Sequence, residues 1–343
     1  MKAVGYYKPL PITESDSLLD LELPAPVASG RDLLVEVRAV SVNPVDTKIR
    51  KRNTPRGSEP RILGFDAAGV VAGTGEEVKL FKVGDEVYYA GSNERAGSNA
   101  QLQVVDERIV GRKPASLGFP EAAALPLTSI TAWELLFDRF GVARGDKPTN
   151  KMVVIGETLL IIGAAGGVGS ILTQLARKLT ALTIVGTASR PETTGWVHSL
   201  GAHYVVDHSY PLGDELRRTG ISQVTYVASL TQTPLHFAEA AELLAPQGKF
   251  GLIDDLGPND VGLLRRKSIS FHWEFMFTRA VFGTPDMIAQ HNLLNEVADL
   301  IDAGVLRTTM QANYGSINAA NLKRAHAMLE SGKTIGKVVL EGW

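Results

Sequence analysis

The sequence predicts an α/β protein that combines a doubly wound parallel sheet with a separate β-rich unit. Two observations carry this prediction. From about Ser129 onward, short apolar runs alternate with stretches of helical periodicity, the order that builds a parallel sheet covered by helices. The first 125 residues instead show short strand patterns separated by turn residues. A chain of 343 residues is long enough for two such domains.

The β-rich unit is predicted from stretches rich in Val and Tyr, with Gly, Pro, Asp and Asn between them. The predicted strands are KAVGYY from Lys2, LLVEVRAVSV from Leu33, AAGVVAGTG from Ala67 and DEVYYAG from Asp85. The closing run, GKVVLEGW, has a short β pattern with no helix after it. We expect this run to add an edge strand to the β-rich unit, which makes that unit discontinuous in sequence.

The parallel-sheet unit is predicted to span residues 129–277, between a first part at 1–128 and a C-terminal part at 278–343. Its first strand, TLLIIGA, is apolar throughout, as expected of a parallel strand buried on both faces. The later predicted strands are LTIVGTA, HYVVDH, QVTYVA, GKFGLID and SISFHW, and the predicted helices follow Gly169, begin at Pro191 and cover PLHFAEAAELLA. The polar stretch 138–152 is predicted to be a surface loop.

Composition excludes several classes of protein. The formal net charge is −2, so the chain lacks the basic footprint of a nucleic-acid partner. Cysteine is absent, which excludes disulfides and thiolate metal ligands. No stretch approaches the roughly 20 apolar residues of a membrane helix, and the N-terminus has no signal-peptide pattern. We expect a cytoplasmic protein that acts on a small molecule, with neither nucleic acid nor membrane as partner.

A glycine cluster, AAGGVG, stands between the first parallel strand and its helix. We expect Gly166 to take a backbone conformation that a side chain would resist, Gly167 to let the backbone approach a diphosphate, and Gly169 to let the helix pack closely on the strand. The helix N-terminus offers N–H groups and a partial positive charge to an anion. This context predicts a dinucleotide site, which Ala164 and Val168 also line. A glycine-rich turn that binds nothing is the alternative.

The end of the second parallel strand indicates which dinucleotide is bound. An NAD site usually offers Asp or Glu to the ribose about 20 residues past the last glycine. Here the sequence reads Thr187-Ala188-Ser189-Arg190. Ser189 can donate a hydrogen bond to a 2′-phosphate, and Arg190 can pair with it bidentately. The sequence therefore favours NADPH over NADH, although Glu192 nearby leaves open that Arg190 is a solvated loop residue.

Four motifs in order, GFDAAGVV, KVGDEVYYAG, EAAALPLTSITAWELL and GAAGGVGS, resemble the medium-chain dehydrogenase/reductase superfamily. The chain is most similar to the zinc-free quinone oxidoreductase (zeta-crystallin-like) branch and, within it, to bacterial zinc-type alcohol dehydrogenase-like proteins. The resemblance covers essentially the whole chain. It implies a GroES-like N-terminal domain, a Rossmann domain, an active-site cleft between them and a homodimer.

The residues that bind zinc in other members of the superfamily are replaced here. Zinc-bearing members place a cysteine in the loop after an N-terminal strand and a GHE triplet further along. This chain has Asn43 at the first position and Phe65 at the second. All seven histidines lie at or after His198, so the region before Ser129 has neither Cys nor His. Because zinc prefers nitrogen and sulfur ligands, we expect no catalytic metal.

The loss of the metal determines the expected chemistry. A metal polarises the oxygen of a simple alcohol or carbonyl. Hydride delivered to the far carbon of an enone or quinone instead leaves a delocalised anion, which a few hydrogen-bond donors can stabilise. The predicted function is NADPH-dependent reduction of quinones or α,β-unsaturated carbonyls. Zinc-independent, NADP-dependent oxidation of secondary alcohols and a non-catalytic role, as in crystallin or RNA-binding relatives, are the alternatives.

Three residues are candidates for a catalytic role. The resemblance places Asn43 at a zinc-ligand position beside the nicotinamide, and a loop cap before Pro44 is the alternative. Thr128 stands where the family has a hydroxyl at the nicotinamide side, and it can instead be a helix N-cap. Lys48 replaces a tyrosine of well-known quinone oxidoreductases, and its amine either donates to an oxyanion or reaches solvent. Asp46 is predicted to orient loop backbone.

The resemblance also implies three further cofactor contacts. His208 aligns with a tyrosine that contacts the 2′-phosphate, and Lys333 is the nearest candidate for a basic residue that does so near the C-terminus. Phe277 is expected near the carboxamide of the nicotinamide. A surface position for His208 and ordinary core packing for Phe277 are the alternatives.

Overall fold

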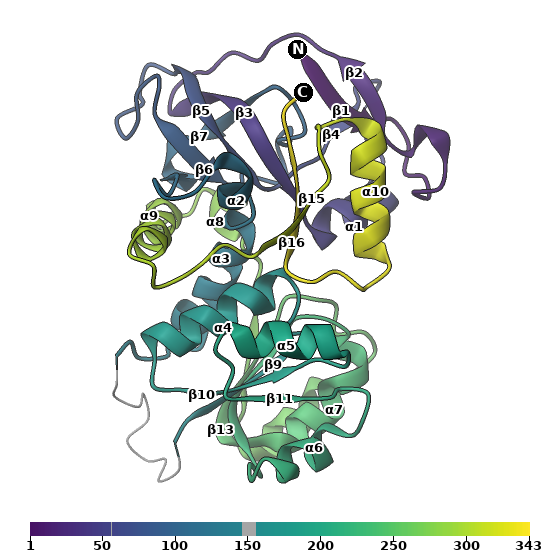
Figure 1. Ribbon diagram of the computed structural model, residues 1–343, viewed down its shortest axis with the longest axis vertical. Helices are drawn as coiled ribbons and strands as arrows, with labels where there is room; N and C mark the ends of the chain where they lie inside the picture. Colours follow the sequence, from purple (N-terminus) through teal and green to yellow (C-terminus); the bar gives the residue numbers. More distant parts are fainter. Residues whose placement is uncertain (56, 146–155) are drawn as a thin grey trace. The chain divides into compact units, whose positions relative to one another are not determined.

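The computed structural model describes residues 1–55, 57–145 and 156–343. They divide into two compact units, one formed by Met1–Ile130 and Phe277–Trp343 and the other by Thr131–Met276 (Figure 1). No helix in this part of the chain is both long and apolar enough to span a membrane. The predicted fold class, a doubly wound parallel sheet plus a β-rich domain, is confirmed.

Strand β3 (Asp32–Val42) is the centre of the first unit, because it pairs antiparallel with three other strands. These partners are β5 (Ala67–Thr74), β7 (Leu102–Asp106) and β16 (Lys337–Glu341). The same sheet continues through β6 (Glu86–Tyr89) and β8 (Val110–Arg112) on one side and β15 (Met310–Asn313) on the other. A small antiparallel sheet joins β1 (Lys2–Tyr6), β2 (Leu19–Glu22) and β4 (Arg61–Ile62).

The C-terminal strand lies inside its sheet, so the prediction of an edge strand is wrong. β16 lies between β3 and β15, with Val339 opposite Ser41. Its outer neighbour β15 has four residues, MQAN, which show no apolar alternation and gave no strand signal. The interior position explains why Lys337 at the start of β16 is buried.

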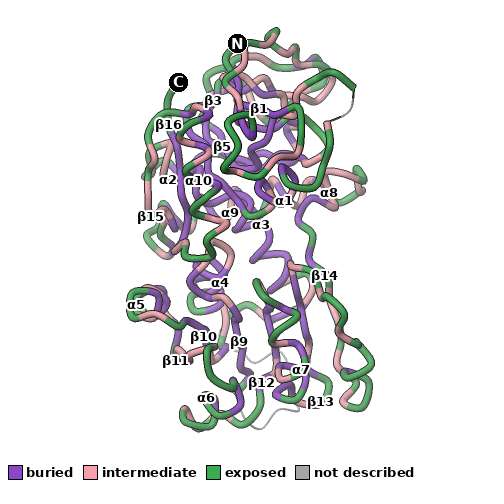
Figure 2. Tube along the Cα trace, turned by 90° about the vertical axis from the view of Figure 1, so that its right-hand side faces the viewer, coloured by how far each residue is buried: buried purple, intermediate pink, exposed green. Residues whose placement is uncertain are grey.

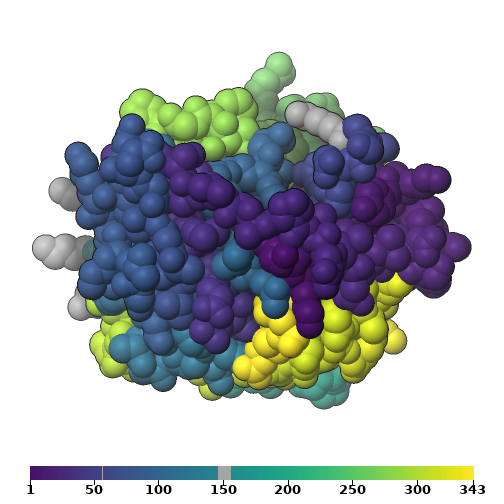
Figure 3. Space-filling model, turned by 90° about the horizontal axis from the view of Figure 1, so that it is seen from above, coloured from purple at the N-terminus to yellow at the C-terminus, as the bar shows by residue number. Residues whose placement is uncertain are grey.

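Helices and the C-terminal segment cover the sheets of the first unit. The helices are α1 (Pro44–Arg52), α2 (Phe119–Ala123), α3 (Pro126–Trp133, which continues into the second unit), α8 (Thr278–Phe282), α9 (Ile288–Asp302) and α10 (Ala319–Glu330). Figure 3 shows the C-terminal segment against N-terminal residues, where the Trp343 indole N–H donates to the carbonyl of Val37 at 3.3 Å.

The second unit contains a parallel sheet in the order β11-β10-β9-β12-β13-β14. The strands are β9 (Thr158–Ile162), β10 (Thr183–Thr187), β11 (Tyr204–Val206), β12 (Val224–Ser229), β13 (Leu244–Leu252) and β14 (Ser270–Trp273). Since β9 comes first in the chain and lies between β10 and β12, the direction of winding reverses there. Doubly wound sheets bind ligands at the carboxyl ends of the strands beside such a reversal.

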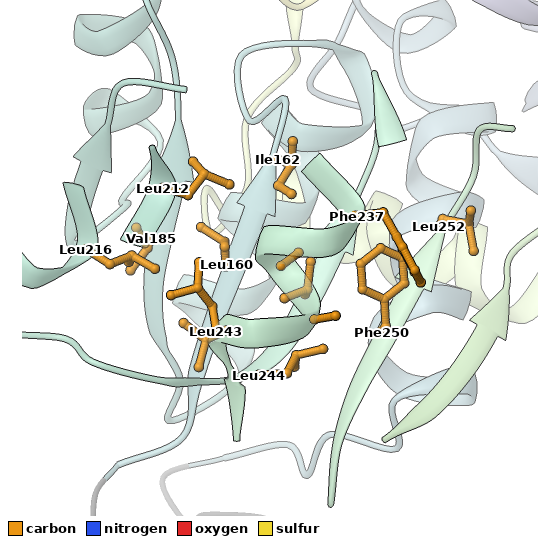
Figure 4. Packing of buried hydrophobic residues seen from close by; sticks show 14 of the residues in the cluster. Leu160, Ile162, Val185, Leu212, Leu216, Phe237, Leu243, Leu244, Phe250 and Leu252 are labelled. Atoms are coloured by element: carbon orange, nitrogen blue, oxygen red, sulfur yellow. The ribbon is translucent and has the colours of Figure 1, made fainter. Parts of the chain in front are cut away.

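Helices cover both faces of this sheet, as Figures 1 and 2 show. The helices are α4 (Gly167–Leu179), α5 (Pro191–Ser199), α6 (Leu212–Arg218) and α7 (Thr233–Leu243). On one face, Leu160 and Ile162 of β9 pack with Leu212 of α6 and Phe237 of α7 (Figure 4). Burying such side chains stabilises the fold by roughly 1.5–3 kcal/mol each, which holds the strand ends in place.

Two local expectations need correction. Helix α6 was not predicted, because its seven residues carry few apolar positions. Part of the predicted loop at 138–152 belongs to a π-helical stretch, Glu134–Arg139, and residues 146–152 of that prediction lie outside the described residues.

Candidate functional site

The glycine turn after β9 differs in detail from the expectation. Gly163 has φ +86°, in the region that favours glycine, and its amide N–H donates to Thr187 Oγ1 at 3.1 Å. Gly166 has φ −73° and ψ −179°, an ordinary extended conformation that starts α4. The prediction that Gly166 takes the demanding conformation is therefore wrong, and Gly163, one position after the apolar strand, takes it instead.

The predicted close packing at Gly169 is confirmed. A Cβ added there would lie 2.5 Å from the carbonyl oxygen of Gly163 and 2.6 Å from Cα of Ala164, both backbone atoms. Gly167 and Val168, in the first turn of α4, are half-buried, and Ala164 is fully buried. The first turn of α4 carries no acidic residue and its N-cap makes no side-chain hydrogen bond. These N–H groups can therefore hold a diphosphate.

Ser189 and Arg190, the predicted contacts of a ribose phosphate, follow β10. Ser189 is exposed, and the Arg190 side chain retains about a third of its accessible surface. Arg190 Nε lies 3.4 Å from Glu192 Oε1, an exposed ion pair of small energetic value. Arg190 can therefore exchange that partner for a phosphate. His208, half-buried after β11, has Nδ1 at 3.1 Å from Thr187 Oγ1.

A second cluster lies in the first unit and centres on Asp66. Its Oδ1 accepts a hydrogen bond from the Leu127 N–H at 2.7 Å, and its Oδ2 accepts from Asn43 Nδ2 at 2.7 Å and from Lys337 Nζ at 3.0 Å. Lys337 Nζ also donates to Asn43 Oδ1 and to the Val42 carbonyl at 3.0 Å. All three side chains are buried, with Lys337 3% and Asn43 1% exposed. Burial raises the pKa of Asp66, and Lys337 opposes that rise.

Asp46 supports this cluster from the N-terminus of α1. Its Oδ2 accepts from the Asn43 backbone N–H at 2.8 Å and its Oδ1 from the Gly64 N–H at 3.0 Å, so the expected role of orienting loop backbone is confirmed. Burial raises the pKa of Asp46 to about 7, although these two backbone donors lower it. Asp46 thereby joins the loop before α1 to the loop before β5.

The other two catalytic candidates lie on helices near this cluster. Thr128 is inside α3, not at its N-cap, and is 2% exposed. Its hydroxyl donates to the Leu125 carbonyl at 3.1 Å, which leaves its oxygen as an acceptor. Lys48 is half-buried on α1, five residues after Asn43.

Two predicted cofactor contacts belong to the first unit. Phe277 is 2% exposed and packs edge-on against Phe65, with ring centroids 5.3 Å apart. This contact satisfies the core-packing alternative, and it also pairs Phe277 with the residue that replaces a zinc-binding histidine. Lys333 is exposed in the loop between α10 and β16. The glycine turn belongs to the other unit.

Sequence reasoning missed Lys337, the only cation bonded to Asp66 among the described residues. A lysine at the start of a strand looks like a solvated end, and only the interior position of β16 buries it. The sequence did contain one sign of this burial: the apolar residues VVL directly after Lys337 indicate a strand buried on both faces.

Two family models match the chain: the alcohol dehydrogenase GroES-like domain over residues 29–127 and the zinc-binding dehydrogenase over residues 200–340. A zinc-type alcohol dehydrogenase-like protein of Staphylococcus aureus is 40% identical over 341 residues, which cover 99% of each chain. The crystal structure of a Rhizobium etli protein, described as a zinc-dependent alcohol dehydrogenase, matches with 56% sequence identity and a TM-score of 0.94. The match covers 100% of this chain and 98% of the Rhizobium chain. A mycobacterial protein solved with NADPH is 25% identical, with a TM-score of 0.83 and full coverage of both chains.

The fold and these matches define an oxidoreductase, and the chain belongs to the medium-chain dehydrogenase/reductase superfamily. Within that superfamily it is similar along its whole length to the zinc-type alcohol dehydrogenase-like proteins of staphylococci.

The donor set does not fit the zinc that these names imply. Asn43 and Phe65 stand at two ligand positions, and the oxygens of Asp66 already accept hydrogen bonds from an ammonium, an amide and a backbone N–H. A divalent cation at Asp66 would face the positive charge of Lys337 within the same buried cluster. The described residues also contain no group of three His, Cys, Asp or Glu side chains placed to hold a metal.

Proposed function

We propose that the protein reduces quinones or α,β-unsaturated carbonyls with NADPH and without a catalytic metal. The observation that supports this proposal is the buried Lys337–Asp66–Asn43 cluster, in which a lysine ammonium bonds Asp66 and also Asn43, the residue that the resemblance aligns with a zinc ligand. Such a site lacks a Lewis acid but offers hydrogen-bond donors, which suits an acceptor whose developing charge is delocalised.

The proposed cofactor site is built from the glycine turn and the end of β10. The backbone N–H groups at the start of α4 hold the diphosphate, while Ser189 and Arg190 bind the 2′-phosphate of the ribose. Neither of these two residues carries the carboxylate that would repel a phosphate. NADPH supplies a hydride when bound.

Asn43 is the proposed donor to the acceptor oxygen. Its amide nitrogen has two N–H groups, and one of them is used by Asp66. Lys337 donates to the amide oxygen, which polarises the amide and strengthens its remaining N–H as a donor. The Thr128 hydroxyl donates its proton to the Leu125 carbonyl. Its oxygen can then only accept a further hydrogen bond, so it suits the carboxamide NH₂ better than a developing anion. Solvent supplies the final proton.

The experiment is a panel of acceptors with NADPH oxidation followed at 340 nm. The proposal expects turnover of quinones or conjugated enones and none of saturated ketones, because only the conjugated acceptors spread the charge. Linear oxidation of saturated secondary alcohols with NADP would favour the alcohol dehydrogenase alternative. Tight NADPH binding with no turnover of any acceptor would favour a non-catalytic role.

A further inference from the structure

Two histidines lie together at the carboxyl edge of the parallel sheet. His208 follows β11, and His236 lies in α7, which follows β12. Their rings are 6.1 Å apart between centroids and meet edge-on at 67°. Both side chains are half-buried. His236 has no motif around it, and nothing in the sequence pattern marked it.

His208 is connected to the glycine turn through Thr187. The Gly163 N–H donates to Thr187 Oγ1 at 3.1 Å, and the same oxygen lies 3.1 Å from His208 Nδ1. Since Oγ1 already accepts from Gly163, its own proton is available to His208 Nδ1. When Thr187 donates that proton to Nδ1, the neutral ring of His208 carries its own proton on Nε2. A ligand anion at this edge therefore meets an N–H donor held in orientation by the cofactor turn.

The register of the sheet places this donor next to the proposed 2′-phosphate residues. Thr187 is paired with Val206 in neighbouring parallel strands. Ser189 and His208 are each two residues beyond that pair, at the same edge of the sheet. A phosphate held by Ser189 and Arg190 is thus within the region that His208 borders.

The charges around the two rings set their protonation. Burial lowers the pKa of both histidines, and His208 further lowers that of His236. Two acidic residues oppose this: Asp207 raises the pKa of His208, and Glu239 raises that of His236. Glu239 also accepts from the Gly213 N–H at 2.8 Å, which spreads part of its charge. Burial thus favours the neutral form of both rings when no ligand is bound.

We propose that His208 and His236 form a proton-linked clamp for the 2′-phosphate of NADPH, so that binding NADPH takes up a proton and binding NADH does not. The inference rests on the proposed cofactor, and it adds His236 and the proton to that site. A phosphate monoester carries between one and two negative charges near neutral pH, since its second pKa is about 6. Such an anion beside two neutral imidazoles favours their protonated form. NADH lacks this group.

The test is isothermal titration of the full chain with NADPH and with NADH, in buffers of different ionisation enthalpy, between pH 6.5 and 8.5. We expect net uptake of a proton with NADPH only, and NADPH affinity that rises by up to about tenfold per pH unit as pH falls. NADH affinity should stay constant over the same range. Equal proton uptake with both nucleotides, or none with NADPH, overturns the inference.

Variants assign the proton to the pair. His236→Asn should reduce proton uptake and weaken NADPH several-fold while leaving NADH unchanged, and His208→Asn should do the same. His198→Asn, an exposed histidine on α5, is the matched control and should change neither nucleotide. Equal weakening of NADPH and NADH by His236→Asn would mean that the ring serves the adenine or the fold, and would overturn the clamp. Failure of the native protein to bind either nucleotide would overturn the proposed function as well, whereas tight NADPH binding without proton uptake would overturn the clamp alone.

Discussion

Replacing Lys337 by Met tests the buried cluster most severely, because it removes one ion and leaves the other in place. The Lys337 ammonium makes three hydrogen bonds, and its side chain is 3% exposed. Asp66 would keep only Asn43 and Leu127 as donors, at 2.7 Å each, around a carboxylate with no exposed surface. Breaking a buried pair in this way costs about 3–5 kcal/mol of unfolding free energy.

The loss should depend on pH in a definite direction. Without Lys337, the folded-state pKa of Asp66 rises further above its ordinary value of 3.8. The folded form then binds a proton that the unfolded form has released, so stability falls as pH rises above about 4. Urea unfolding followed by far-UV circular dichroism should therefore show a larger deficit for Lys337→Met at pH 8 than at pH 5.

The double variant Lys337→Met with Asp66→Asn completes the cycle. It removes both charges and keeps an oxygen for the Leu127 N–H, so it should recover most of the loss and give a coupling of about 2 kcal/mol or more. Lys8→Met, at an exposed lysine of the same unit, should change stability by less than about 0.5 kcal/mol. A loss below about 1 kcal/mol for Lys337→Met, or additive single effects, would refute the coupling between the charges.

Five other substitutions have clear expected outcomes. Arg190→Ala should weaken NADPH about 10- to 100-fold and leave NADH nearly unchanged in fluorescence titrations, because only NADPH carries the phosphate that Arg190 pairs with; equal losses would contradict the assignment. Gly169→Ala should lower both cofactor affinity and the melting temperature, since its added Cβ would lie 2.5 Å from the carbonyl oxygen of Gly163. Gly166→Ala should be tolerated, because its added Cβ would lie 3.6 Å from that same oxygen, an ordinary contact distance. Burial and the nearby Glu134 raise the pKa of Glu274 to about 9 from 4.5, so the native chain loses stability as pH rises between these values. Urea titrations between pH 5 and 8 should therefore show that Glu274→Gln gains stability relative to the native chain by up to about 1.4 kcal/mol per pH unit. A difference that stays constant with pH would show that Glu274 is ionised throughout. For the homodimer that the resemblance implies, we propose Trp273, 56% exposed on the last strand of the parallel sheet, as a contact. Light scattering should then show a dimer for the native chain and a monomer for Trp273→Glu; an unchanged mass would exclude that contact.

Local patterns predicted most of the second unit. The apolar run at β9 and the proline at the start of α5 each indicate one element directly, and both match the structure. The glycine turn was recognised, but the residue with positive φ is Gly163, which lies between the end of the strand at Ile162 and the start of the glycine-rich motif at Ala164. Motif spacing alone does not determine where within a turn the chain reverses direction.

Long-range pairing explains what the sequence could not predict. Lys337 and Asp66 are 271 positions apart, and their contact depends on β16 lying between β3 and β15. His208 and His236 approach each other only because the segments after β11 and β12 converge at one edge of the sheet. Neither pair leaves a periodic signal in the chain, since each member follows the pattern of its own element.

Hydride transfer without a metal is the central claim, and zinc content measured together with activity tests it most directly. The same sample is analysed for zinc and assayed for NADPH oxidation with a quinone or enone before and after exhaustive chelation. The structure predicts substoichiometric zinc and an unchanged kcat/KM. Stoichiometric zinc, with turnover lost on chelation and restored by adding zinc, would contradict it.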